Sequence, residues 1–235
     1  GTVDVTDKRS GRTYAGQNLF EDTRDVGDLY NYWQAKDDVA VTTADAKAEI
    51  SLHEVTPWSV TFKASVPMAI DGEITTYVTL SDKTARVDFK TVVTNRMENH
   101  RLRALFTSDI ETGSVYAEGQ FDVVRRDIMP AETWKNPCNA QRDQAFVTLE
   151  SESGNEALMV ANRGLCEYEV LRDGRNTLAI TLLRSIGQIG DWGVFPTPLG
   201  QKKGTWTLEY AMVPYQTTNK AEAYGLGYVF AGPAA

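Results

Sequence analysis

Hydrophobic and polar residues alternate along much of this chain. Between Ser59 and Val66 every second residue is apolar, and the residues between them are Thr, Lys or Ser. Side chains of a strand point alternately to opposite faces, so this pattern predicts a strand with one buried face. The same alternation recurs at about 74–80 and 86–91, and the polar breaks at 71–72 and 81–83 suit hairpin turns.

Further strand-like runs fill most of the remaining chain. They lie at about 100–107, 113–124, 144–150, 156–162, 166–171, 177–183 and 205–213. Many short strands, spaced about 10 to 12 residues apart, are typical of an antiparallel β sandwich. We therefore predict an all-β fold, a large antiparallel β sandwich with little or no helix. The segment 43–47 is locally helix-friendly, but no convincing amphipathic helix is present.

Two segments do not fit a strand pattern. One runs from the amino terminus to about Trp33, and the other from Met129 to Asp143. Long irregular segments in compact domains tend to be functional loops or to cover another surface. A weak boundary near 94–100 would divide the chain into two lobes, although the composition does not change there.

The composition narrows the function classes. The 235 residues suffice for one large β domain or two small ones, and 42% hydrophobic residues can build a core. A net charge of -8 argues against a nucleic-acid partner, which needs a basic surface. No run approaches the roughly 18 apolar residues of a membrane span, so no membrane partner is expected. No segment resembles a signal peptide, and we expect a cytoplasmic protein.

The ends and the cysteines add two expectations. The chain starts at Gly1 without a methionine and ends in small residues, so we treat it as a piece of a longer protein. Cys138 and Cys166 are too few for a disulfide framework. We expect two reduced thiols, and a single bridge between them stays open.

Neither metal chemistry nor the common catalytic motifs are indicated. His53 and His100 both lie inside strand patterns and have no second histidine at ligand spacing, so we expect structural histidines and no zinc site. The chain has no Gly-x-Ser-x-Gly elbow, no phosphate-binding glycine loop and no dinucleotide fingerprint. Phosphoryl-transfer and hydride-transfer chemistry are therefore poorly supported, whereas the composition leaves a Ser-His-Asp triad open.

The segment 20–33 concentrates four acids and four aromatic residues in a glycine-containing stretch. Aromatic faces stack on the apolar C–H faces of sugars, and carboxylates accept hydrogen bonds from sugar hydroxyls. The alternative is an ordinary acidic loop whose aromatic side chains pack into the sandwich. Residue types alone do not decide between these interpretations.

Six segments, in order, resemble the β region that follows the catalytic domain in glycoside hydrolase family 38. The segments especially resemble its bacterial mannosylglycerate-hydrolase-like branch. The segments are Gly27-Asp28-x-Tyr30-x-Tyr32, NRMENHRLRALF (95–106), EGQFDVVRR (118–126), ANRGLCEYEV (161–170), LAITLLRSIG (178–187) and PTPLGQKKGTWTLEYAMVP (196–214). One departure is Asp127, where many members of the family have proline.

This resemblance implies that residues 1–235 form the C-terminal β-sandwich region of a retaining α-mannosidase. The expected architecture is a super-sandwich, similar to galactose mutarotase. In the family, zinc and an aspartate nucleophile lie on an amino-terminal catalytic domain, which is absent from this chain. The expected partners are that catalytic domain and an α-mannoside, and a homo-oligomer stays open. No cofactor, metal or catalytic residue is expected here, and the chain alone should be inactive.

The resemblance also assigns three substrate-binding residues. The β region of the family contributes a tyrosine and an arginine to the rim of the mannose pocket, which correspond here to Tyr30 and Arg126. Asp28 is a third candidate, as an acceptor for a sugar hydroxyl. Arg125 is an alternative to Arg126, because strand alternation sends neighbouring side chains to opposite faces.

Two other functions stay open from the sequence. A stand-alone carbohydrate-binding sandwich would present an exposed aromatic platform built from Tyr30, Tyr32 and Trp33. A self-sufficient glycosidase would need a concave site with two carboxylates about 5 to 9 Å apart.

Overall fold

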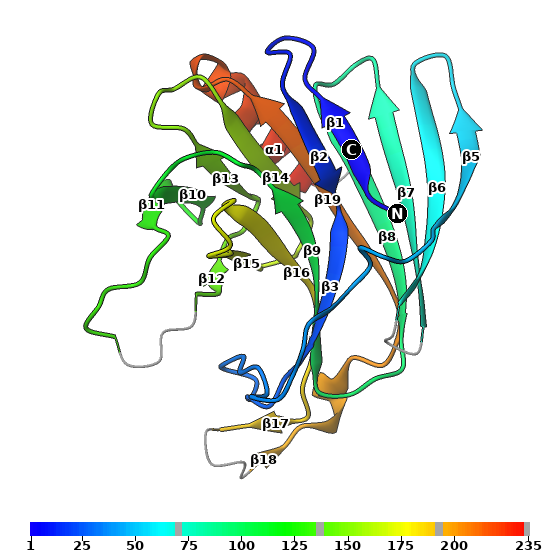
Figure 1. The fold of residues 1–235 in the computed structure, drawn as a ribbon, viewed down its shortest axis with the longest axis vertical. Helices are drawn as coiled ribbons and strands as arrows, with labels where there is room; N and C mark the ends of the chain where they lie inside the picture. Colours follow the sequence, from blue (N-terminus) through cyan, green and yellow to red (C-terminus); the bar gives the residue numbers. More distant parts are fainter. Residues whose placement is uncertain (69–71, 135–138, 191–194, 233–235) are drawn as a thin grey trace.

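The computed structural model describes residues 1–68, 72–134, 139–190 and 195–232. Most of the described chain forms two antiparallel sheets (Figure 1). The larger has nine strands, in the spatial order β11 (Val123–Asp127), β10 (Ser114–Glu118), β13 (Phe146–Glu150), β14 (Ala157–Asn162), β19 (Gly204–Tyr215), β8 (Val87–Asn95), β7 (Gly72–Ser81), β6 (Ser59–Met68) and β5 (Glu49–Val55). The smaller has six strands, in the order β12 (Gln141–Arg142), β15 (Glu167–Val170), β16 (Thr177–Ser185), β9 (His100–Thr107), β3 (Leu19–Arg24) and β4 (Val41–Thr42).

Smaller elements complete the fold. Two hairpins pair β1 (Val3–Thr6) with β2 (Thr13–Gln17) and β17 (Gln188–Ile189) with β18 (Phe195–Pro196). The helical elements are two 3-10 turns, η1 (Pro198–Gln201) and η2 (Thr217–Asn219), and the helix α1 (Lys220–Ala231). Among the described residues, no helix is long and apolar enough to cross a membrane.

The two sheets face each other across one hydrophobic core. Phe106 of the six-stranded sheet packs edge-on against Phe89 of the nine-stranded sheet, with ring centroids 5.6 Å apart. Phe89 in turn stacks on Tyr210 of the neighbouring strand β19 at 5.5 Å. The aromatic rings therefore join the sheets into one β sandwich with a continuous core, as the alternation predicted.

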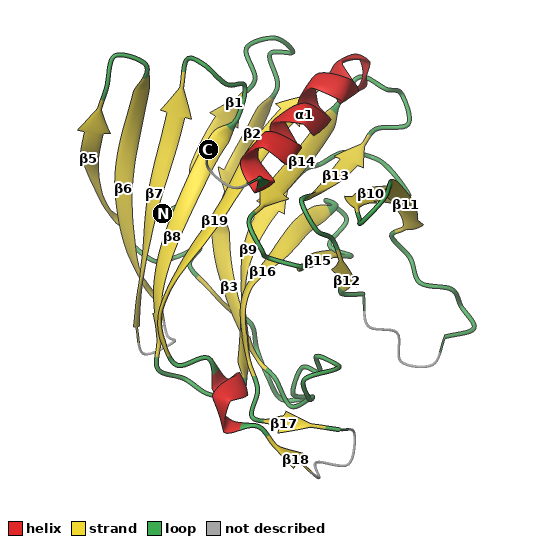
Figure 2. Cartoon of the chain, turned by 180° about the vertical axis from the view of Figure 1, so that it is seen from behind, coloured by secondary structure: helices red, strands yellow, loops and turns green. Residues whose placement is uncertain are grey.

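A second apolar layer lies on the outer face of the nine-stranded sheet, where α1 covers β13, β14 and β19 (Figure 2). Along β14, Leu158 and Val160 face the six-stranded sheet, whereas Met159 faces the helix. All six residues of β14 are buried, because this strand has an apolar neighbour on each face.

The structure corrects three details of the sequence-based prediction. The segment before Trp33 is not irregular throughout, since it contains β1, β2 and β3. The run 113–124 is two strands joined by a turn in which the Gly119 N–H donates to the Asp122 carbonyl at 2.9 Å. The helix α1 was also missed. The weak boundary at 94–100 is the crossing from β8 to β9, which lie in opposite sheets around the one core.

Candidate functional site

The loop 25–33 follows β3 and is closed at its base by backbone pairing. The Val26 N–H donates to the Trp33 carbonyl at 2.8 Å, and the Asp28 N–H donates to the Asn31 carbonyl at 2.9 Å. A Cβ atom at Gly27 would lie 2.0 Å from the Asn31 carbonyl oxygen. Only glycine therefore fits at position 27 without displacing the loop backbone.

Two aspartates of the acidic segment organise this loop from within. Asp28 Oδ1 accepts the backbone N–H groups of Tyr30 at 2.9 Å and Asn31 at 2.8 Å, which is an Asx turn. Asp25 Oδ1 accepts the N–H groups of Gly27 at 2.9 Å and Trp33 at 3.2 Å. Both aspartates are buried, at 1% exposure for Asp25 and 4% for Asp28. The two carboxylates thus fix the backbone that carries Tyr30.

The electrostatic surroundings keep the Asp28 carboxylate ionised. Burial raises its pKa, but the backbone N–H groups of Asn31, Tyr30 and Gly190 and the positive charge of Arg184 lower it, and the net shift is downward. An ionised Asp28 remains an acceptor at neutral pH.

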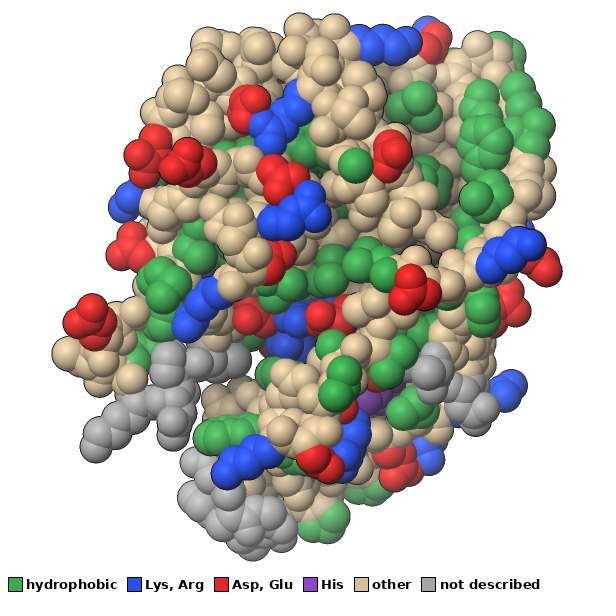
Figure 3. Space-filling view, in the orientation of Figure 1, with side chains coloured by type: hydrophobic (Ala, Val, Ile, Leu, Met, Phe, Trp, Pro, Cys, Tyr) green, Lys and Arg blue, Asp and Glu red, His purple; other side chains and the backbone are tan. Residues whose placement is uncertain are grey.

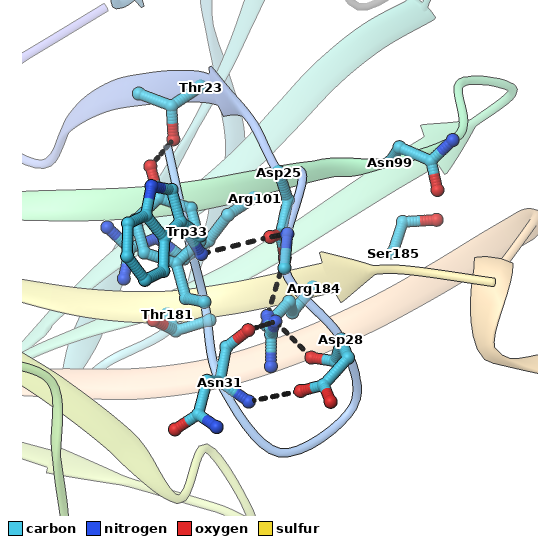
Figure 4. A network of polar contacts seen from close by, with 12 residues as sticks. Thr23, Asp25, Asp28, Asn31, Trp33, Asn99, Arg101, Thr181, Arg184 and Ser185 are labelled. Carbon is cyan, nitrogen blue, oxygen red and sulfur yellow. Dashed lines mark hydrogen bonds and ion pairs between the residues drawn. The ribbon is translucent and has the colours of Figure 1, made fainter. Parts of the chain in front are cut away.

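Arg184 of β16 holds the loop from outside (Figure 4). Its Nε donates to Asp25 Oδ2 at 2.7 Å, and its Nη2 donates to the Asn31 carbonyl at 2.6 Å and to the Asp28 carbonyl. One planar guanidinium therefore binds three points of the loop at once. The role of Arg184 was not predicted from the sequence. The sequence singled it out only as part of the segment LAITLLRSIG. Its hydrogen-bond partners lie more than 150 residues away in the chain, so no local pattern predicts the contact.

The aromatic residues of the loop point in different directions. Tyr30 is 72% exposed and Trp33 is 51% exposed. Tyr32 turns inward, where its ring lies over the guanidinium of Arg101 at 3.4 Å and its hydroxyl bonds to Thr23 Oγ1 at 2.9 Å. The predicted platform of three exposed rings is therefore wrong for Tyr32, because a cation–π contact occupies its face.

Beneath Tyr32, the outer face of β9 carries two buried arginines. Arg103 donates to Glu21 from Nε at 2.9 Å and to Glu169 from Nη1 at 2.5 Å. The guanidinium of Arg101 lies 3.5 Å from the Glu169 carboxylate. The pKa of Arg101 is lowered, mainly by burial and secondly by the nearby positive charge of Arg103. The carboxylates of this face are thus engaged by arginine.

His100, at the start of β9, is a structural residue, as predicted. Its Nδ1 lies 2.6 Å from Asp22 Oδ2, and its Nε2 lies 2.9 Å from Asn95 Oδ1. The Asn95 amide nitrogen donates to the Lys202 carbonyl at 3.1 Å, which fixes the orientation of that amide. His53 lies on the exposed strand β5 and packs against Tyr77 at 4.7 Å. No group of three or more His, Cys, Asp or Glu side chains suited to a metal occurs in the part of the chain that the structure describes.

Arg126 and Arg125 lie on β11, at the edge of the nine-stranded sheet, and point to opposite sides. Arg125 is exposed and pairs with Asp127 at 3.7 Å. Arg126 turns inward and donates to the Arg142 carbonyl at 2.6 Å and the Tyr168 hydroxyl at 3.1 Å. The alternation therefore separates the two arginines, and only Arg126 faces the cleft next to β11.

This cleft has a volume of about 300 Å³ and combines apolar, aromatic and polar walls. Among its lining residues are Arg126, Tyr168, Met129 and Trp134. Asp143, whose charge interacts with Arg126, is buried behind the cleft, and its burial raises its pKa to about 7. Its Oδ2 accepts a hydrogen bond from Asn162 Nδ2 at 2.7 Å.

The predicted substrate-binding residues thus fall into two groups. Tyr30 and Asp28 share one Asx turn beside the six-stranded sheet, whereas Arg126 lies on an edge strand of the other sheet. No hydrogen bond or ion pair within the described ranges joins Arg126 to the loop 25–33. Of the cysteines, Cys166 is exposed, whereas Cys138 lies outside the described residues.

The chain is similar in sequence to known proteins along most of its length. The family model described as "Glycosyl hydrolases family 38 C-terminal domain" matches residues 1–191. A protein of Halalkalibacterium halodurans named "Putative mannosylglycerate hydrolase" is 29% identical over 246 residues, which cover 92% of this chain and 27% of that protein.

Two solved structures from Enterococcus faecalis agree with this match. An alpha-mannosidase from strain V583 superposes with a TM-score of 0.90 at 30% identity, covering 97% of this chain and 29% of the other. A protein of glycosyl hydrolase family 38 gives a TM-score of 0.84 at 29% identity, covering 96% and 30%. The chain therefore spans less than one third of the length of these relatives.

Proposed function

Because this chain belongs to glycosyl hydrolase family 38 and corresponds to its C-terminal domain, we propose that it is the non-catalytic β part of an α-mannosidase. In this proposal it packs on a catalytic domain outside the present chain and completes the rim of the sugar pocket. The substrate class follows from the relatives, one named an alpha-mannosidase and one a mannosylglycerate hydrolase. Zinc is expected in the catalytic domain.

The observation that carries this proposal is the placement of Tyr30. Its side chain is 72% exposed, yet its backbone is fixed by the Asp28 carboxylate and, through the Asn31 carbonyl, by Arg184. An exposed phenol on a rigid loop suits a hydrogen bond to a sugar hydroxyl, because little ordering remains to be done when the ligand binds. Asp28 then acts by positioning Tyr30.

Arg126 would form a second part of the rim. Its Nη1 is committed to the Arg142 carbonyl and the Tyr168 hydroxyl. The remaining donors of its guanidinium suit hydroxyls or the carboxylate of a charged aglycone such as glycerate, because an arginine fork binds planar acceptors in two-point contacts. The exposed Trp134 on the same cleft offers an apolar face beside this charge.

The test of this function uses the full-length enzyme. Tyr30→Phe removes one hydroxyl from an exposed side chain, and we expect kcat/KM for an aryl α-mannoside to fall about tenfold, as for one lost hydrogen bond. Tyr228→Phe, at a half-exposed tyrosine of α1 whose ring packs on Phe146, is the matched control and should leave kcat/KM unchanged. An unaltered kcat/KM in Tyr30→Phe would remove Tyr30 from the pocket.

The purified 235-residue chain provides the second test. We expect no hydrolysis of an aryl α-mannoside, with or without added zinc. Glu21, Glu169 and Asp25 are paired with arginines, and Asp28 Oδ1 is occupied by two backbone N–H groups of the loop. Reproducible turnover by this chain would instead indicate a self-sufficient glycosidase.

A stand-alone carbohydrate-binding module is the second candidate, and the exposure of Tyr30 and Trp33 is what favours it. It requires the isolated chain to bind mannosides. Titration calorimetry with methyl α-mannoside distinguishes the two functions, since only the binding module should give a saturable signal without a catalytic domain.

A further inference from the structure

Within the described residues, part of the inner face of the nine-stranded sheet is uncovered at the β5 end, although Val66 and Ile74 of β6 and β7 are buried. The six-stranded sheet ends at the two-residue strand β4, whereas the nine-stranded sheet continues through β7, β6 and β5. Several large apolar side chains are exposed there, and we call four of them the β5–β7 strip: Ile50 (65% exposed), Leu52 (58%), Phe62 (47%) and Leu80 (60%). Figure 3 shows hydrophobic side chains gathered over these strands on the right of the view.

The register of the strands places the strip on the same face as the core. Leu52 pairs with Phe62, Phe62 with Val78, and Val78 with the core residue Phe89. Residues paired across an antiparallel ladder project from the same face of the sheet. The strip is therefore the lateral continuation of the sandwich core beyond the last strand of the smaller sheet.

The opposite face of the same strands is polar. Ser51 pairs with Lys63, and Lys63 with Tyr77, while Ser65 Oγ bonds to Thr75 Oγ1 at 3.0 Å. One face of these strands is thus suited to water and the other is not. Monomeric soluble proteins rarely leave a contiguous apolar patch of this kind bare, so the strip marks an interaction surface.

We propose that a segment of the full-length enzyme outside residues 1–235 packs on the β5–β7 strip and continues the smaller layer beyond β4. This inference rests on the proposed function only in taking the chain as part of a longer α-mannosidase. The aligned relatives have ample chain for this role, since the matched region is 27% to 30% of their length.

The position of Gly1 supports an occupant from the same polypeptide. A Cβ atom at Gly1 would lie 3.4 Å from the Cβ atoms of Ala48 and Val66. Val66 is a core residue of β6, and Ala48 packs against the same core just before β5. A segment that precedes Gly1 would therefore leave the described structure beside the strip, and its covalent link to Gly1 favours its packing there over the packing of a separate molecule.

Adjacent residues of β5 provide a matched test, because Leu52 lies in the strip and Ser51 lies on the polar face. Both side chains are exposed in residues 1–235. In the full-length enzyme, Leu52→Cys should react with a maleimide about tenfold more slowly than Ser51→Cys, since a covered thiol is inaccessible to the reagent. Mass spectrometry of the β5 peptide separates these thiols from Cys138 and Cys166.

Charge substitutions give a second readout that does not depend on catalysis. Leu52→Glu should lower the midpoint of thermal unfolding of the full-length enzyme by several degrees, whereas Ser51→Glu should leave it within about one degree. Equal labelling rates and equal midpoints for the two positions would overturn the proposal. Protection of Leu52→Cys that disappears on dilution would also overturn it, because a second copy of the enzyme would then be the occupant.

These outcomes are separable from those of the proposed function. Loss of the Tyr30 effect on kcat/KM would leave the labelling contrast at β5 intact. Conversely, a bare strip would leave the role of Tyr30 in the pocket untouched.

Discussion

Arg184 and Asp25 lie 159 residues apart in the chain and meet through a 2.7 Å contact between Nε and Oδ2. The Asp25 side chain in this pair has 0% exposure, and its other oxygen accepts two loop N–H groups. A buried carboxylate without its cation costs far more free energy than an exposed one. The ion pair therefore decides whether the loop 25–33 keeps its conformation.

Replacing Arg184 should destabilise the chain strongly. In Arg184→Met we expect the free energy of unfolding to fall by about 3 to 5 kcal/mol, because Asp25 and two loop carbonyls lose their donor. Urea denaturation measures the change. The control is Arg175→Met, which breaks an exposed 2.7 Å pair with Asp109 and should cost about 1 kcal/mol or less. Similar losses in both variants would contradict this account of Arg184.

Gly27 should not tolerate a side chain. In Gly27→Ala the new Cβ would meet the Asn31 carbonyl oxygen at 2.0 Å and the Trp33 nitrogen at 2.9 Å, so the loop must shift. We expect a loss of about 1 to 3 kcal/mol in the free energy of unfolding. Gly113→Ala, where no atom lies within 4 Å of the new Cβ, should change it by about 0.5 kcal/mol or less. A neutral Gly27→Ala would mean that the loop is not packed as described.

Two glycines of α1 should respond in opposite directions. Gly225→Ala places its Cβ in open space and should stabilise the chain by about 0.5 to 1 kcal/mol through helix propensity. Gly227→Ala brings its Cβ to 2.7 Å from Phe146 Cδ1 and should cost about 1 to 3 kcal/mol. Thermal unfolding of both variants measures the difference. Two changes of the same sign would show that α1 does not dock on β13 through Gly227.

Asp143 should make stability depend on pH. Burial raises its pKa to about 7 from the usual 3.8 of an aspartate, so the native state binds a proton more tightly than the unfolded state. The contribution of Asp143 to the free energy of unfolding is fully present below about pH 4 and is lost as the pH rises towards 7. The total loss is at most about 4 kcal/mol. Asp143→Asn should remove this dependence and be more stable than the parent chain at pH 8.

Urea denaturation at pH 5 and pH 8 tests the Asp143 prediction. The control is Asp127→Asn at an exposed position, which should follow the parent chain at both values. If Asp143→Asn keeps the parent's pH dependence, another group is responsible for it.

The sequence predicted those features that depend on neighbouring residues. The alternation of apolar and polar residues located β6, β7, β8 and most later strands. In a strand with one solvent-exposed face, consecutive side chains point alternately to the core and to water. The helix α1 was missed because its buried residues are Ala223, Gly227 and Phe230, two of which are small and give little apolar contrast.

The candidate site was predictable only in part, for a related reason. The resemblance singled out the segment containing Asp28 and Tyr30, but their spatial partners come from distant strands. Arg184 is part of β16, and the orientation of Arg126 depends on the pairing of β11 with β10. The periodicity of a sequence does not predict such long-range contacts, because they form only when distant strands pair in the folded sheets.

The position of β19 has a consequence for how the chain folds during synthesis. Among the described strands this one is the last in sequence, yet it lies between β14 and β8 at the middle of the nine-stranded sheet. The four strands on one side and the four on the other are joined only through it. A nascent chain that ends at residue 191, where the family match stops, would carry two half-sheets with open edges. The ribosome must therefore deliver residues 204–215 before the sheet can close, and until then those edges need protection from aggregation.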